Sequence, residues 1–239
     1  MKKKCLVIPG NPAVASQYLS WIDEIKSQNE DLDISYATSY ILFDRKLSYV
    51  KYHDAMCDHY EKILLKLGEE QKITILAHSA GSYFALRLLE KYPERIDEVI
   101  LLFPYIGYSK IPLLYFVRIP YYIDRVFPLA EIVAFCKNLL MLLDKNVQYI
   151  SRLELTANLR FGVRQCVYFI KNKFNAKKIE AYRDKIHFIY IENDKWCPQA
   201  TIDLLRPVSI YEQTLIPHDF IVSAELRERM TKTILQYLV

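Results

Sequence analysis

Ser79 lies in a sequence pattern that is typical of a hydrolytic nucleophile. It is the centre of Ala77-His78-Ser79-Ala80-Gly81, which differs from the G-x-S-x-G pattern only at its first position. In that pattern a strand turns so sharply into a helix that the residues two before and two after the serine must be small, and alanine is still small. The turn exposes the hydroxyl at a helix N-terminus, where developing negative charge is stabilised. The pentapeptide alone also occurs by chance around buried serines, but the strand and helix expected on either side favour a nucleophile.

Two histidines follow Ser79, and a serine nucleophile needs such a base within hydrogen-bond reach. In α/β-hydrolases the order along the chain is serine, then Asp or Glu, then histidine. His187 falls inside an expected strand, 185–191, far from its end. His218 follows the last expected strand, 207–211, where the histidine of a triad belongs. We therefore expect His218 to be the base; the alternative is a loop histidine with a local role.

The acid that orients the histidine should follow the strand before last, 185–191. Asp194 is our choice there, and Glu192 is the reserve because it leaves the strand slightly early. The other usual position, directly after the expected strand 98–103, offers no carboxylate. Asp219 adjoins the histidine in sequence and would point the wrong way to accept from its second nitrogen.

An oxyanion hole in this kind of site takes one backbone N–H from the residue after the nucleophile, here Ala80. The second should come from the turn after the first strand, Pro9-Gly10-Asn11-Pro12. Pro12 has no N–H, so we expect the Asn11 backbone to be the donor, with Gly10 allowing the close approach. The alternative is a plain tight turn.

Strands and helices alternate along most of the chain, which predicts an α/β fold with a doubly wound, mostly parallel sheet of about six strands. The expected strands are 3–8, 33–38, 73–77, 98–103, 185–191 and 207–211. Helical periodicity is expected around Trp21, over 49–67, over 83–89 and after Ser223. In such sheets the functional residues lie at the carboxyl ends of the strands, and each candidate site residue above follows a strand. We expect one domain, 1–239.

The interval 105–178 interrupts the alternation and is expected to form a helical cap over the strand ends. It is rich in aromatic residues and divided by prolines at 112, 120 and 128. A helical subdomain needs its own core, and an acyl-chain pocket would need the same residues; both interpretations stay open. Lys171, Lys173, Lys177 and Lys178 are interpreted as a solvated face, with contact to anionic lipid as the alternative.

Composition and charge narrow the expected partners, cofactors and cellular location of the protein. The chain has 239 residues and a formal net charge of +4, too small to predict a nucleic-acid partner. Its five cysteines are irregularly spaced without C-x-x-C, so we expect neither a disulfide framework nor zinc, and no motif calls for a cofactor. Met1 and three lysines resemble the start of a signal peptide, but the apolar run that follows, Cys5 to Ile8, is too short for one, and no stretch approaches a membrane span. We expect a cytoplasmic protein, or one peripheral to a membrane or lipid droplet surface.

Taken together, these motifs resemble the lipid droplet-associated hydrolase family of α/β-hydrolases over nearly the whole chain. The departures are Ala13 and Ala77, where the family usually has Gly, and the absence of its S-P-N-G after Pro104, which bears on cap geometry and substrate choice. The segments that carry the resemblance are Pro9-Gly10-Asn11-Pro12 with the aromatic Tyr18, the elbow 77–81, Leu101-Leu-Phe-Pro, Asp194-Lys-Trp-Cys-Pro and His218-Asp-Phe.

The resemblance implies an esterase- or lipase-like serine hydrolase acting on lipophilic esters, including sterol esters. Thioester hydrolysis is the alternative within enzymes, because the same triad serves it. The alternative outside enzymes is a protein that binds lipid surfaces and has a vestigial triad. The aromatic insertion and the nearby lysines suggest this alternative.

Overall fold

The core of the protein is a six-stranded sheet in which all paired strands are parallel. The computed structural model describes residues 2–10, 15–37, 49–67, 71–106, 174–194 and 196–238. The spatial order is β2-β1-β3-β4-β5-β6. The strands are β1 (Lys3–Ile8), β2 (Leu32–Tyr36), β3 (Ile73–His78), β4 (Ile96–Leu102), β5 (Ile186–Tyr190) and β6 (Ile210–Gln213). This arrangement is that of an α/β hydrolase, as the sequence predicts.

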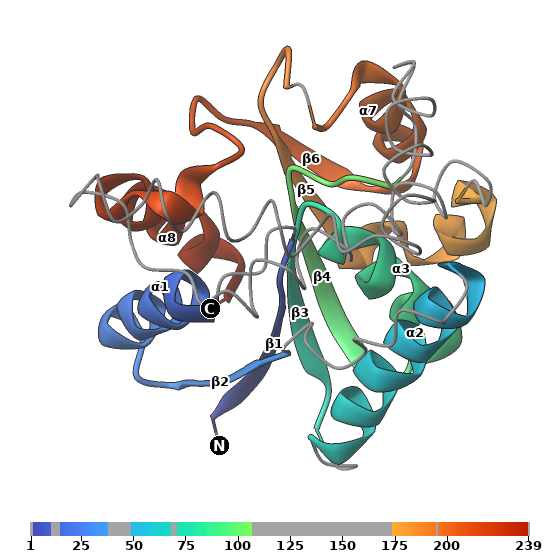
Figure 1. The fold of residues 1–239 in the computed structure, drawn as a ribbon, viewed down its shortest axis with the longest axis horizontal. Coiled ribbons are helices and arrows are strands. Elements are labelled where there is room, and N and C mark those ends of the chain that lie inside the picture. Colours follow the sequence, from blue (N-terminus) through green and yellow to red (C-terminus); the bar gives the residue numbers. More distant parts are fainter. Residues whose placement is uncertain are drawn as a thin grey trace, which may run out of the picture.

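Helices cover both faces of the sheet (Figure 1). One face carries α1 (Ala15–Gln28) and α8 (Ala224–Leu238), which lie side by side, together with the short 3₁₀ helix η3 (Phe220–Val222). The other face carries α2 (Tyr49–Lys66), α3 (Gly81–Lys91), α7 (Gln199–Leu205), and the 3₁₀ helices η1 (Ala176–Lys185) and η2 (Arg206–Val208).

The alternation of side chains along each strand divides the core in two. In β1, Leu6 and Ile8 pack into the α2/α3 core, whereas Cys5 and Val7 pack into the α1/α8 core, and all four are buried. A strand that is apolar on both sides has no solvent face, which is the signature of a parallel sheet covered by helices. The same alternation turns His78, the last residue of β3, toward the α1/α8 side, where it contacts Phe220.

The predicted strands agree with the structure to within two residues at each end, except at the start of the last strand, and helix α7 was not predicted. Strand 207–211 was predicted to begin at Pro207, but Arg206–Val208 form η2 and β6 begins only at Ile210. Pro207 has a fixed φ and no N–H, so it suits the first turn of a helix better than a strand that pairs with β5. The prediction of this strand's start was therefore wrong by three residues.

Most of the expected cap, 107–173, lies outside the described residues, and the cap stays a prediction. Its two ends are described: Tyr105, Ile106, Phe174 and Ala176 are buried in the α2/α3 core. Of the lysine cluster, Lys177 and Lys178 are described and exposed, and Lys178 Nζ lies 2.7 Å from Glu90 Oε1.

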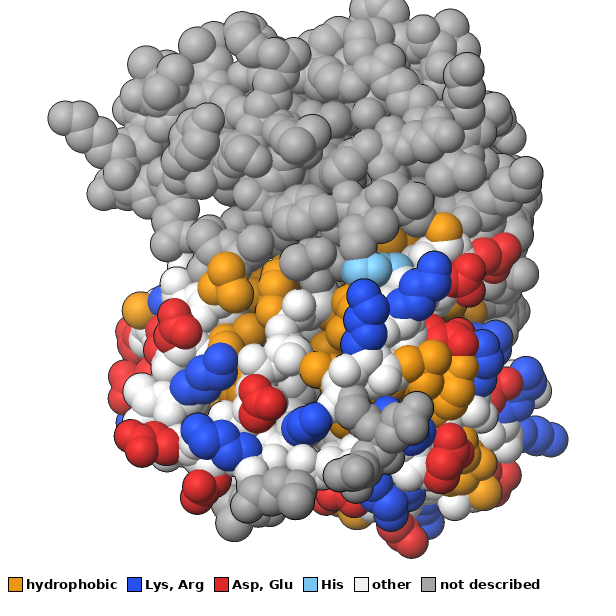
Figure 2. Space-filling model, turned by 90° about the horizontal axis from the view of Figure 1, so that it is seen from below, with side chains coloured by type: hydrophobic (Ala, Val, Ile, Leu, Met, Phe, Trp, Pro, Cys, Tyr) orange, Lys and Arg blue, Asp and Glu red, His pale blue; other side chains and the backbone are white. Residues whose placement is uncertain are grey.

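Charges of both signs are interspersed over the described part of the face seen in Figure 2. None of the described helices is long and apolar enough to cross a membrane.

Candidate active site

Three of the predicted site residues follow three different strands and meet at the carboxyl edge of the sheet. Ser79 follows β3, Asp194 lies four residues after β5 and His218 five residues after β6. His218 Nε2 lies 3.0 Å from Ser79 Oγ, and His218 Nδ1 lies 2.7 Å from Asp194 Oδ2. The carboxylate can only accept, so Nδ1 carries the proton and Nε2 is free to accept from the serine hydroxyl. This is the arrangement of a general base beside a nucleophile.

Asp194 is held in place on both of its oxygens. Its side chain is only 2% exposed, and its Oδ1 accepts a hydrogen bond from the Trp196 backbone N–H at 2.7 Å. Burial by itself would raise the pKa of this carboxyl, but the hydrogen bond and charge of His218 and the N–H groups of Trp196 and Cys197 hold the pKa below its usual value. Asp194 therefore stays ionised at neutral pH. The other carboxylates considered, Glu192 and Asp219, are both exposed.

The turn at Ser79 has the strained backbone of a nucleophile elbow. Ser79 has φ 49°, in the left-handed region that non-glycine residues rarely adopt. Its N–H donates to the Leu102 carbonyl at 2.8 Å, and its carbonyl accepts from Tyr105 N–H at 3.0 Å, so the end of β4 holds the turn. Phe103 (φ 48°) and Asn193 (φ 60°) share this conformation, and each lies just after a strand at the same edge of the sheet. Strain of this kind concentrates at functional sites.

Small residues let β1 approach the elbow closely. A Cβ at Gly81 would lie 2.6 Å from the carbonyl oxygens of both Ile8 and Pro9, and one at Gly10 would lie 2.8 Å from Ser79 Cβ. Real Cβ atoms do not approach backbone oxygens this closely, so both positions need glycine. Ala77 at the other side of the elbow is fully buried and accommodated.

The expected oxyanion donors are described only in part. Ala80 has helical dihedral angles (φ −62°, ψ −23°) and directly precedes α3, so its N–H belongs to those that have no acceptor within the helix. Asn11 lies outside the described residues, and its role stays a prediction. The Gly10 N–H is already used, because it donates to the Tyr18 hydroxyl at 2.9 Å.

Two buried side chains beside the elbow were not assigned a role by the sequence. His78 Nε2 lies 3.0 Å from the His218 carbonyl oxygen, and His78 Nδ1 lies 2.6 Å from the Tyr18 hydroxyl. Tyr18 was noted only as part of the family resemblance, and His78 only as the variable position of the elbow. The pairs are 60 and 140 residues apart in the chain, so no local spacing could reveal them.

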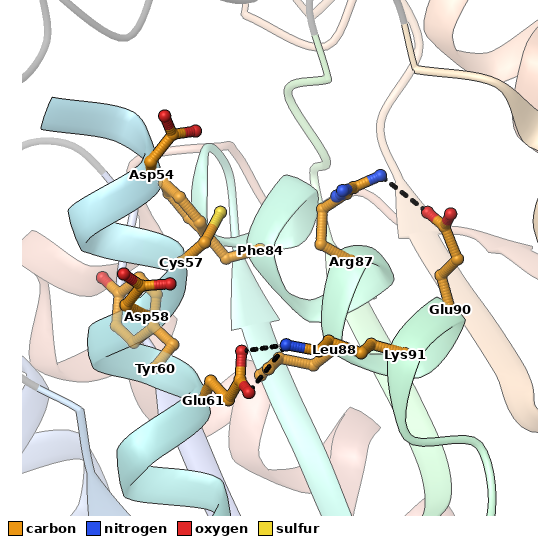
Figure 3. Close-up of a pocket in the computed structure, with 10 residues that line it drawn as sticks. All are labelled: Asp54, Cys57, Asp58, Tyr60, Glu61, Phe84, Arg87, Leu88, Glu90 and Lys91. Atoms are coloured by element: carbon orange, nitrogen blue, oxygen red, sulfur yellow. Dashed lines mark hydrogen bonds and ion pairs between the residues drawn. The ribbon is translucent and has the colours of Figure 1, made fainter. Parts of the chain in front are cut away.

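A second nucleophile candidate lies on the α2/α3 face, in a cavity of about 520 Å³ between these two helices (Figure 3). Cys57 lines it, with its Sγ 3.7 Å from His53 Nδ1. Burial raises the pKa of the Cys57 thiol to about 12 and lowers the pKa of His53 to about 3, so both groups stay neutral. This pair cannot form a thiolate–imidazolium couple. Within the described ranges, no group of three His, Cys, Asp or Glu side chains is placed to hold a metal ion.

Comparison of the sequence with known proteins identifies the family of the chain. A family described as lipid-droplet associated hydrolase matches residues 1–221. The chain belongs to this hydrolase family. It is also 26% identical over 179 residues to a lipid droplet-associated hydrolase of Pongo abelii, a match that covers 64% of this chain and 54% of the relative. The chain thus spans about half the length of that relative.

Solved structures support the same fold for this member of the lipid-droplet associated hydrolases. A carboxylesterase structure from Nitrososphaera gargenis superposes with a TM-score of 0.71 at 12% identity, covering 99% of this chain and 90% of that one. A thioesterase domain from the curacin biosynthetic pathway gives 0.61 at 10% identity, covering 98% and 91%. At such identities the likeness concerns the α/β-hydrolase fold alone.

Proposed function

We propose that the protein is a serine hydrolase that cleaves carboxylic esters of lipophilic substrates through a covalent acyl-enzyme. The observation that carries the proposal is the continuous set of hydrogen bonds from Ser79 through His218 to the ionised Asp194, built on a strained elbow. The fold and family are those of hydrolases.

We assign the following roles to these residues. Ser79 Oγ attacks the acyl carbon while His218 Nε2 accepts its proton, and Asp194 keeps the other imidazole nitrogen protonated and stabilises the imidazolium. His218 then donates the proton to the leaving alcohol, and a water molecule, activated by the same base, releases the acid. The Ala80 N–H, with Asn11 as the expected second donor, stabilises the oxyanion at each step.

Apolar side chains beside the triad support a lipophilic substrate. Trp196, Leu215 and Val222 are 56%, 82% and 53% exposed, and they flank Asp194 and His218 in sequence. A contiguous exposed apolar patch commonly marks a binding surface, and we propose that these three side chains belong to one. We extend the proposal to peripheral contact with a lipid surface, in keeping with the family description.

Labelling with a fluorophosphonate probe tests the proposal. We expect wild-type protein to be labelled, Ser79→Ala to lose labelling and ester turnover, and His218→Ala to lose both. Ser82→Ala is the matched control, because this serine is also buried, lies three residues along and has a hydroxyl without a partner among the described residues. Labelling that persists in a folded Ser79→Ala protein would contradict the assignment.

A substrate series then separates the ester from the thioester alternative. We expect turnover of simple esters to rise with acyl length and to exceed that of the matched acyl-CoA thioesters. A folded wild-type protein that floats with lipid droplets but is neither labelled nor active would instead favour the lipid-binding alternative.

A further inference from the structure

The imidazole of His78 is the centre of a buried hydrogen-bond network that joins three separate segments. His78 is 6% exposed and Tyr18 is fully buried. His78 bonds to the His218 backbone carbonyl on one side and to the Tyr18 hydroxyl on the other, and Tyr18 bonds to Gly10 N–H. The network therefore links the turn after β1, the elbow after β3 and the loop that carries the base.

The direction of each bond is fixed by chemistry. The His218 carbonyl can only accept, so His78 Nε2 must carry a proton. Burial, with a smaller contribution from His218, lowers the pKa of His78 to about 3, so the ring is neutral and its Nδ1 is an acceptor. Tyr18 must then donate to Nδ1, and its oxygen is left to accept from Gly10 N–H. Each group has one role, and the tautomer of His78 is determined.

We propose that His78 and Tyr18 are positioning residues of the hydrolytic site, which hold the His218 loop and the Gly10 turn in register with Ser79. This inference rests on the proposed function. The Ser79 hydroxyl bonds to His218, whereas His78 and Tyr18 bond to the backbone of His218 and Gly10. The His78 ring also lies against the His218 ring, with centroids 5.2 Å apart.

Two features make the placement of the His218 loop sensitive to this network. His218 lies between β6 and η3, where the regular hydrogen bonding of a strand or helix does not hold it. The Gly10 turn packs directly on the elbow, since a Cβ there would meet Ser79 Cβ at 2.8 Å and His78 Nδ1 at 3.1 Å. A misplacement of about 1 Å in a reacting group can cost on the order of 10²-fold in rate.

Two substitutions at His78 separate its two hydrogen bonds. The amide nitrogen of His78→Gln reaches the position of Nε2 and keeps a donor for the His218 carbonyl, but it leaves Tyr18 without an acceptor. The amide oxygen of His78→Asn takes the position of Nδ1 and keeps the acceptor for Tyr18, but it cannot reach the carbonyl. Tyr18→Phe removes the hydroxyl that joins His78 to Gly10.

The measurement is kcat per fluorophosphonate-reactive serine, which corrects for any misfolded fraction. We expect kcat to fall by roughly 10²-fold in His78→Asn and roughly tenfold in Tyr18→Phe, with His78→Gln nearer to wild type and KM changed less than twofold in all three. Tyr36→Phe is the control for Tyr18→Phe, because its ring stacks on Tyr18 with centroids 5.8 Å apart. A purely structural role would lower the labelled fraction and leave kcat per labelled site unchanged, and that result would overturn the inference.

Histidine ¹⁵N NMR of the wild-type protein provides a second test, which does not depend on the variants folding. We expect His78 to show a protonated Nε2 and an unprotonated Nδ1, unchanged between about pH 5 and 8. The opposite tautomer, or titration in this range, would overturn the network. Wild-type protein that is folded but not labelled would refute the proposed hydrolase function, whereas labelled wild type with unaffected variants would refute only the positioning role.

Discussion

Asp194 is buried and ionised, and its role can be tested by removing only the charge. Asp194→Asn can present its amide N–H to His218 Nδ1, which forces the imidazole proton onto Nε2, where it can no longer accept from Ser79. We expect kcat for ester hydrolysis to fall by roughly 10³–10⁴-fold with the fold retained. A variant with more than a tenth of the wild-type rate would show that Asp194 does not orient the base.

The effect of Asp194→Asn on the free energy of unfolding should depend on pH. The native pKa of Asp194 lies below its unfolded value of about 4, so the carboxylate stabilises the folded state fully above that pH and loses this contribution as the pH falls through the native pKa. The difference in unfolding free energy between wild type and Asp194→Asn should be largest at neutral pH and shrink below about pH 4. Urea unfolding at several pH values measures it; a difference that stays constant with pH would contradict the assigned shift.

At the scale of elements, the elbow depends on the close contact between α3 and the end of β1. Gly81→Ala would place its Cβ 2.6 Å from two backbone oxygens, so the backbone itself must move. We expect this variant to lose about 1–3 kcal/mol in unfolding free energy and to react more slowly with a fluorophosphonate, because the turn beside Ser79 is displaced.

Ala77→Gly is the control for Gly81→Ala, since it changes the other small position of the elbow without adding atoms. Its expected cost is about 0.5–1 kcal/mol, from the greater freedom of glycine in the unfolded chain. Equal losses in the two variants would mean that steric contact at Gly81 is not the cause.

Chain order and strand ends were enough to predict which candidate residues lie together, but not the contacts that form across the fold. Ser79, Asp194 and His218 each follow a strand, and parallel strands bring their carboxyl ends to one edge. The start of β6 was misplaced because Pro207 and Val208 were grouped with the residues of the following strand, whereas they belong to the 3₁₀ turn η2. The Tyr18–His78 bond joins α1 to β3, and neither residue type nor spacing indicates it.

At the scale of the whole molecule, Arg227 connects α8 to α1, 203 residues away in the chain. This arginine is 7% exposed; its Nε donates to Glu24 Oε1 at 3.0 Å and its Nη1 to the Ile221 carbonyl at 3.1 Å. It thus holds α8 to α1 and to the segment just after His218. We expect Arg227→Met to lose about 1–3 kcal/mol in urea unfolding, most of it from the buried carbonyl and less from the partly exposed carboxylate.

Arg229→Met is the matched control, because Arg229 lies on the same helix and is exposed. We expect its unfolding free energy to stay within about 0.5 kcal/mol of wild type. If both variants lost the same amount, the buried contacts of Arg227 would not explain its effect.

The packing of α1 against α8 delays the folding of α1 while the chain is being synthesised. Trp21 bonds to Thr231, 210 residues later in the chain, so α1 packs both on the sheet and against a helix that is synthesised last among the described elements. At ribosomal rates of about 5–20 residues per second, α1 waits roughly 10–40 s for its partner. During that time Trp21 lacks its contacts with Phe220 and Thr231, and its exposed ring is a surface to which a chaperone can bind while the chain is still attached to the ribosome.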